Sequence, residues 1–98
     1  MRYSITISEE ARNDELESYH YYELQHNGLG DEFLEALENC YASISKNPQF
    51  FSFTDKRKVL RHIRLKRFPF VIIFEVSGND VYVYSVHHTS RYPFNKSS

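Results

Sequence analysis

The sequence has few of the residues that mark exported, membrane or disulfide-stabilised proteins. Cys40 is the one cysteine among 98 residues, so no internal disulfide bond can form and a reducing, cytoplasmic location is expected. The longest apolar run, from Phe68 to Phe74, has seven residues with Pro69 among them, whereas a membrane-spanning helix needs about 20. The N-terminal region becomes acidic at Glu9 and shows no secretory signal. We therefore expect neither membrane insertion nor export.

The sequence is also poor in motifs that hold cofactors and metals. Its three glycines all fit turns, which excludes a glycine-rich phosphate-binding loop. Cys40 lies in an apolar helical pattern and is interpreted as a core residue rather than a catalytic thiol. The adjacent His87 and His88 cannot easily both reach one ion from a strand, and no cysteine or carboxylate cluster lies near them in the sequence. We expect no cofactor and no metal.

A formal net charge of −1 conceals a strong asymmetry along the chain. Residues 1–55 carry eleven acids and three bases, a charge of −8, whereas residues 56–98 carry two acids and nine bases, a charge of +7. Such an imbalance between the two halves indicates interaction surfaces of different character. Near-neutrality therefore does not exclude an anionic partner.

Eight tyrosines and eight phenylalanines supply much of the apolar material. Because each aromatic ring buries a large area, they can build one modest core with few aliphatic residues. We predict a single domain over residues 1–94 and a frayed tail over residues 95–98.

Hydrophobic periodicity predicts two consecutive helices near the N-terminus. After a short strand over residues 3–7, Ser8 is expected to cap a helix over residues 9–27, which ends at Asn27-Gly28. Asp31 is expected to cap a second helix, which ends at Asn47-Pro48. The short connection predicts an antiparallel helical hairpin.

The remaining elements are predicted to be strands, over residues 59–65, 70–76 and 81–88, after a loop over residues 49–58. The order β-α-α-β-β-β predicts an α+β, two-layer domain in which the helical hairpin packs on a mainly antiparallel four-stranded sheet. Val71 and Ile73 give the middle strand a second apolar face. Such a face needs a cover, either a partner protein or second copy, or a loop or tail of the chain itself.

The densest charged feature is the run from Lys56 to Arg67, with seven bases in twelve residues and no acid. On a strand, His62, Arg64 and Lys66 point to one side, and Arg61, Ile63 and Leu65 point to the other. A row of cations suits a phosphate backbone or an acidic protein. The alternative is a solvated run of charge.

A second candidate feature is the segment from Val86 to Pro93, which ends the last strand. His87 and His88 face opposite sides of a strand, and histidine can act as acid or base near neutral pH. Arg91 can hold a phosphate and Tyr92 can stack on a base. The alternative is one structural and one exposed histidine.

The order of elements and several short motifs resemble the RelE/ParE superfamily of small bacterial toxins from type II toxin–antitoxin modules. These motifs are Ser8-Glu9-Glu10-Ala11, Asn47-Pro48, Arg67-Phe68-Pro69-Phe70 with the strand to Val76, and Val86 to Arg91, where an arginine follows a histidine by three residues. The resemblance covers roughly residues 2–93. The Arg67-Phe68-Pro69-Phe70 turn favours the ParE side.

The resemblance implies a growth-inhibiting toxin that a cognate antitoxin holds inactive. ParE-like members poison DNA gyrase, and RelE-like members cleave mRNA on the ribosome. Where RelE-like nucleases carry a key strand arginine, this sequence has Val71. Losing one positioned cation costs on the order of 3 kcal/mol of transition-state stabilisation, so the favoured hypothesis is a ParE-like inhibitor without chemistry of its own. The alternatives are a ribosome-dependent endoribonuclease and a non-toxic module that only binds its antitoxin.

The resemblance and the residue chemistry together define two sets of site residues. A nuclease site would consist of His62, Arg64, Lys66, His88, Arg91 and Tyr92. Target or antitoxin binding is expected at Arg61, Arg64, Lys66, Arg67, Phe68, Val71, Ile73 and Arg91. The antitoxin tail, rich in acids and apolar residues, is expected to lie across the basic and apolar surface and to form a hetero-oligomer.

Overall fold

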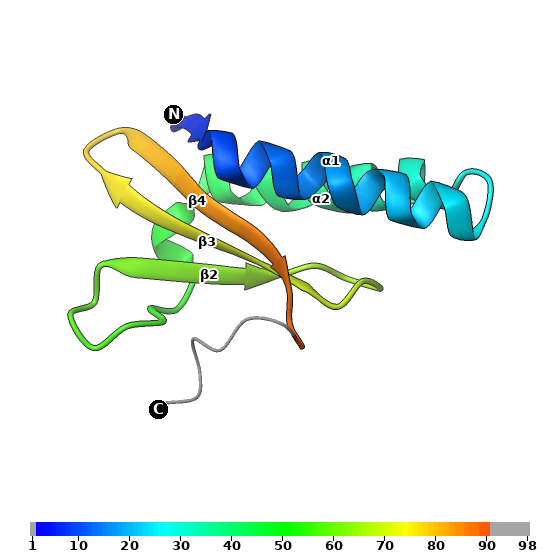
Figure 1. The fold of residues 1–98 in the computed structure, drawn as a ribbon. Coiled ribbons are helices and arrows are strands. Elements are labelled where there is room, and N and C mark those ends of the chain that lie inside the picture. Colours follow the sequence, from blue (N-terminus) through cyan, green and yellow to red (C-terminus); the bar gives the residue numbers. More distant parts are fainter. Residues whose placement is uncertain (1, 91–98) are drawn as a thin grey trace.

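The computed structural model describes residues 2–90, which form a helical hairpin on one face of a sheet (Figure 1). The elements are β1 (Ser4–Ile7), α1 (Glu9–Gln25), α2 (Leu29–Lys46), the 3-10 helix η1 (Pro48–Phe50), β2 (Leu60–Arg64), β3 (Phe70–Ser77) and β4 (Asp80–His88). The predicted α+β order β-α-α-β-β-β is confirmed. Neither helix of the described part is long and apolar enough to cross a membrane. The predicted tail, residues 95–98, lies outside the described residues.

Helix α1 begins where the sequence predicts. Ser8 has extended backbone angles (φ −63°, ψ 158°), and its hydroxyl oxygen accepts a hydrogen bond from the Ala11 amide at 3.0 Å. Glu9 and Glu10 lie in the first turn, where their charges stabilise the positive end of the helix dipole.

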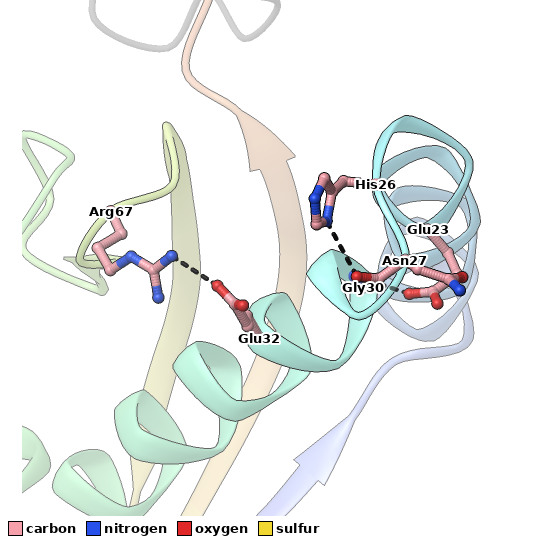
Figure 2. A network of polar contacts seen from close by, with 6 residues as sticks. All are labelled: Glu23, His26, Asn27, Gly30, Glu32 and Arg67. Atoms are coloured by element: carbon pink, nitrogen blue, oxygen red, sulfur yellow. Dashed lines mark hydrogen bonds and ion pairs between the residues drawn. The ribbon is translucent and has the colours of Figure 1, made fainter.

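The start of α2 differs from the prediction. Gly28, in the left-handed region (φ +89°), is the N-cap, so Asp31 lies within the first turn and is not the cap. The Glu23 carboxylate accepts a hydrogen bond from the Gly28 amide at 3.0 Å. It accepts a second from the Gly30 amide at 2.9 Å (Figure 2). A side chain from the preceding helix therefore supplies the acceptors that Asp31 was expected to supply.

The sheet has the strand order β1-β4-β3-β2. Strand β1 pairs in parallel with β4, and the β4–β3 and β3–β2 pairs are antiparallel. The sheet is thus mixed but mainly antiparallel. Gly78, with φ +61°, provides the tight turn between β3 and β4.

The core lies between the helices and the sheet face that they cover. Strand residues Ile72, Phe74 and Val83 meet helix residues such as Phe33 and Ile44, and all of these side chains are at most 1% exposed. Cys40 is 6% exposed within this core, which confirms its structural interpretation. Burial raises the pKa of its thiol to about 11, so the reactive thiolate is scarce near neutral pH.

The second apolar face of β3 is buried as well. Val71 is 0% and Ile73 2% exposed in the isolated chain. Of the two kinds of cover considered for these residues, a partner or second copy is not needed, because the chain buries both residues by itself.

Candidate functional site

The sheet face turned away from the helices, here named the outer face, gathers several predicted site residues. Cross-strand pairing places Arg64, Val71 and His87 in one row across three strands, and His62, Ile73 and Ser85 in the next. Residues paired directly across strands share a face. The outer face therefore combines one guanidinium and two imidazoles around a buried apolar centre.

A β-bulge decides which of the two adjacent histidines lies on the outer face. Ile73 pairs with Ser85 and Phe74 pairs with Val83, so Tyr84 is an extra residue in β4. Beyond such a bulge the in-and-out alternation of a strand is shifted by one. Val81 and Val83 face the core before the bulge, and Val86 faces it afterwards. His87 consequently belongs to the outer face and was missed as a site residue. The change from odd to even apolar positions in β4 was the signal that could have identified it.

His88 lies on the helix-facing side, so its predicted grouping with His62 and Arg64 is wrong. Its ring packs against Phe70, with 5.3 Å between centroids. Its Nδ1 accepts a hydrogen bond from the Ser90 amide at 3.1 Å. It lines a cleft of about 550 Å³ between α1 and the end of the sheet, together with Glu17, Ser18, Tyr21, Tyr22, Phe70 and Ser90.

His62 is the outer-face histidine with a displaced pKa. Burial, followed by the positive charge of Arg64, lowers the pKa of the imidazole from its ordinary value of 6.5. It is therefore mainly neutral at pH 7 and able to accept a proton. Arg91 and Tyr92, the other predicted nuclease residues, lie outside the described residues.

The turn between β2 and β3 contains two predicted binding residues, of which Arg67 lies at the surface and Phe68 in the core. Arg67, in the left-handed region (φ 73°), forms an ion pair with Glu32 of α2 at 2.6 Å (Figure 2). The side chain of Phe68 instead points inward and is 7% exposed, with ring centroids 5.0 Å from Tyr22 and 5.5 Å from Phe33. Phe68 is therefore a core residue and not a surface contact.

Val71 and Ile73 likewise offer little surface to a partner, because both are buried. Arg61 faces the helix side of the sheet and has an internal role. Its Nη1 donates hydrogen bonds to the carbonyl oxygens of Phe51 at 2.7 Å and Gln49 at 3.2 Å, and its guanidinium lies 3.9 Å from the centre of the Phe53 ring. Arg61 thus anchors the preceding loop.

Three predicted binding residues do share a cleft of about 470 Å³ between α2 and the β2 side of the sheet, here named the α2–β2 cleft. They are Arg64, Lys66 and Arg67, and α2 contributes Glu32, Glu35, Ala36, Asn39, Cys40 and Ser43. The cleft has basic groups on the sheet side and acidic groups on the helix side. It is suited to a chain that carries both charged and apolar side chains.

Among residues 2–90, no three histidine, cysteine or carboxylate side chains are grouped so that they could hold a metal ion. The described residues therefore offer charged and apolar side chains for binding, and the imidazoles of His62 and His87 on the outer face.

A helical hairpin on a four-stranded mixed sheet, in the order β-α-α-β-β-β, agrees with the fold expected for the RelE/ParE class. Residues 5–93 match the model of the family described as "ParE toxin of type II toxin-antitoxin system, parDE". The chain belongs to this family of type II toxins.

A solved structure with a similar fold is titled "Chromosomal ParDE TA system from P. aeruginosa". The TM-score is 0.68, with 17% sequence identity over 88% of this chain and 95% of the other. At this identity the likeness establishes the fold alone. No curated protein matches the sequence.

Proposed function

We propose that the chain is a ParE-like toxin that inhibits an essential target such as DNA gyrase by binding it, and that a cognate antitoxin neutralises it. The observation that carries the proposal is Val71, which occupies the strand position where the resemblance to RelE-like nucleases implies an arginine. Val71 is fully buried between Arg64 and His87 and offers no charge to a phosphate. A phosphoryl-transfer site needs such positioned charge, so binding is favoured over cleavage.

Gyrase inhibition is tested with the purified chain in a DNA supercoiling assay. We expect supercoiling to fall as the protein is added and to recover when the protein is first mixed with its cognate antitoxin. Normal supercoiling at a saturating concentration of the chain would exclude gyrase as the target.

We further propose that the antitoxin tail occupies the α2–β2 cleft. Strand β2 is the outermost strand of the sheet. Residues 52–54 are hydrogen-bonded to its first half, at Leu60 and His62, so the end of β2 at Ile63 and Arg64 is the part that can pair with an extended segment. The cations Lys66 and Arg67 are suited to the acids expected in that tail, and the apolar wall around Ile63 and Ala36 is suited to its apolar residues.

Charge removal in the cleft distinguishes this site from general electrostatic attraction. The variant Lys66→Gln/Arg67→Gln is expected to weaken antitoxin binding at least about tenfold in calorimetry, since two charged contacts are lost. The control Arg2→Gln/Lys46→Gln removes the same charge from exposed positions outside the cleft and is expected to bind normally. Equal affinities of the two variants would place the antitoxin elsewhere.

Ribosome-dependent mRNA cleavage is retained as a second candidate because His62, Arg64 and His87 share the outer face. Primer extension on ribosome-bound mRNA tests it. A nuclease on this face would lose its cuts in His62→Ala and His87→Ala but keep them in His88→Ala, because His88 lies on the other side of the sheet. The absence of induced cuts would exclude cleavage. A module that only binds its antitoxin would leave growth unchanged when overexpressed without the antitoxin.

A further inference from the structure

The basic run of residues 56–67 is divided by the fold into two separate groups. Lys56, Arg57 and Lys58 precede β2, and Lys66 and Arg67 follow it. At about 3.3 Å per residue, the five residues of β2 hold the groups roughly 15 Å apart. Two bases lie between them. Arg61 is bound to the carbonyl oxygens of Gln49 and Phe51, and Arg64 lies opposite Val71 on the outer face. The α2–β2 cleft uses the second group and leaves the first without a role.

The first group lies at the tip of a well-ordered loop. Oδ1 of Asp55 accepts hydrogen bonds from the amides of Val59 at 2.9 Å and Leu60 at 3.0 Å, and the Asp55 carbonyl accepts one from the Lys58 amide at 3.1 Å. The same amides lower the pKa of the Asp55 carboxyl. Lys58 is held in the left-handed region (φ 59°). The tip therefore has a defined shape before any ligand arrives.

The two arms of the loop are also tied to β2. The Thr54 amide donates to the Leu60 carbonyl at 2.7 Å, and the His62 amide donates to the Ser52 carbonyl at 3.1 Å. Between these two hydrogen bonds, Phe53 and Arg61 form an isolated antiparallel β-bridge. The Arg61 guanidinium lies over one face of the Phe53 ring. Figure 1 shows this loop projecting at the corner of the molecule beyond the start of β2.

All three cations at the tip are exposed, and none forms an ion pair within the described part of the chain. The ring of Phe53, in the same loop, is 38% exposed. Clustered cations neutralise phosphates, and an exposed ring stacks on an unpaired base. An acidic amphipathic peptide would instead need an apolar groove, and both clefts described above are lined by other residues.

We propose that the tip formed by Phe53, Lys56, Arg57 and Lys58 binds the sugar–phosphate backbone of a nucleic acid, preferentially where its bases are unpaired. The proposal assigns the loop a binding role. Its one acid, Asp55, uses Oδ1 to accept hydrogen bonds from two amides that shape the tip. The inference rests on the loop alone and is independent of the toxin's target.

Binding is measured by fluorescence anisotropy with a labelled 20-nucleotide single-stranded DNA and the duplex of the same sequence. Three phosphate contacts give a slope of log affinity against log salt concentration of about −2 for the single strand. The affinity should therefore fall about 20-fold between 50 and 200 mM salt. The variant Lys56→Gln/Arg57→Gln/Lys58→Gln is expected to lose the salt dependence and at least about tenfold in affinity.

A matched control removes three cations from the exposed surface elsewhere, in Arg2→Gln/Arg12→Gln/Lys46→Gln, and should bind like the unaltered chain. Phe53→Leu retains apolar bulk beneath Arg61 and should weaken single-strand binding at least about fivefold while leaving duplex binding unchanged. Absence of DNA binding, or equal affinities of the two triple variants, would overturn the proposal. It would also be overturned if the unaltered chain bound a glutamate-rich peptide of equal charge as tightly as DNA, which would assign the tip to an acidic protein.

Discussion

At the scale of single residues, the connection between the helices depends on one carboxylate and two glycines. Glu23 holds the amides of Gly28 and Gly30 at the start of α2. Gly28 supplies the left-handed backbone, and Gly30 supplies space. A Cβ atom on Gly30 would lie 2.7 Å from Glu23 Oε1 and 2.8 Å from the Tyr19 ring. A side chain at this position would therefore require Glu23 or Tyr19 to shift.

Gly30→Ala tests this packing against helix propensity. Alanine favours a helix interior by about 1 kcal/mol over glycine, whereas overpacking in a tight site costs about 1–3 kcal/mol. We expect the clash to prevail and the free energy of unfolding in urea to fall by about 1 kcal/mol. An increase in stability would show that Glu23 and Tyr19 can move aside without cost.

His62 makes the stability of the domain depend on pH. Since burial lowers the folded-state pKa of this imidazole below its ordinary value of 6.5, the unfolded chain takes up a proton more readily than the folded chain. The free energy of unfolding should therefore decline as the pH falls from above 6.5 towards the folded-state pKa. Urea titrations between pH 8 and 5 should show this decline to be smaller in His62→Gln. Parallel pH profiles would contradict the assignment.

At the scale of elements, α1 depends on its neighbours for stability. Ala11 and Ser18 are its only buried side chains among the described residues, whereas α2 buries a complete apolar stripe. Tyr41 of α2 donates a hydrogen bond to the half-buried carboxylate of Glu15 on α1. Burial raises the pKa of Glu15, and this hydrogen bond lowers it. The pair therefore ties the weaker helix to the stronger one.

Tyr41→Phe should destabilise the domain by about 1 kcal/mol at pH 7, because a half-buried carboxylate loses its donor. It should also raise the pKa of Glu15 further. Once the carboxyl group is protonated it no longer needs a donor for its charge, so the loss should be smaller at pH 4. Urea unfolding at both pH values measures this difference, and an equal loss at each would contradict a role for the Glu15 charge.

At the scale of the whole molecule, both layers contribute to one core. Phe33 of α2 is fully buried, and its ring contacts Phe68 in the β2–β3 turn and Phe70 of β3. The acidic helical layer and the basic β2 side are joined through this apolar contact, and the Arg67–Glu32 ion pair bridges them at the surface. The two layers are therefore expected to unfold together.

Phe33→Ala should remove about 3–5 kcal/mol of stability, a large part of the 5–15 kcal/mol that is usual for a domain. Because the chain lacks tryptophan, tyrosine fluorescence reports tertiary structure while far-ultraviolet circular dichroism reports secondary structure. We expect one coincident transition for both signals in the unaltered chain and in the variant. Separate transitions would show that the layers unfold independently.

The element order and most of the core were predictable because they follow from short-range patterns. The Ser8 cap, the apolar stripe of α2 and the strands around Phe70–Ser77 and Asp80–His88 each depend on neighbours a few residues away. The predictions for Asp31 and Phe68 were wrong because each depended on distant residues. Glu23 already occupies the α2 amides, and Phe68 fits between Tyr22 and Phe33.

The sequence by itself determined the α+β order, the core of α2 and β3, and the separation of acidic from basic segments. Periodicity, capping and charge along the chain contain that information. Only the tertiary structure decided that His87 rather than His88 lies beside Arg64 and Val71, that Arg61 faces inward, and that the basic run has two separate ends. These outcomes depend on strand register, on the bulge at Tyr84 and on contacts between distant segments, and a one-residue shift in register reverses the face of every side chain that follows it.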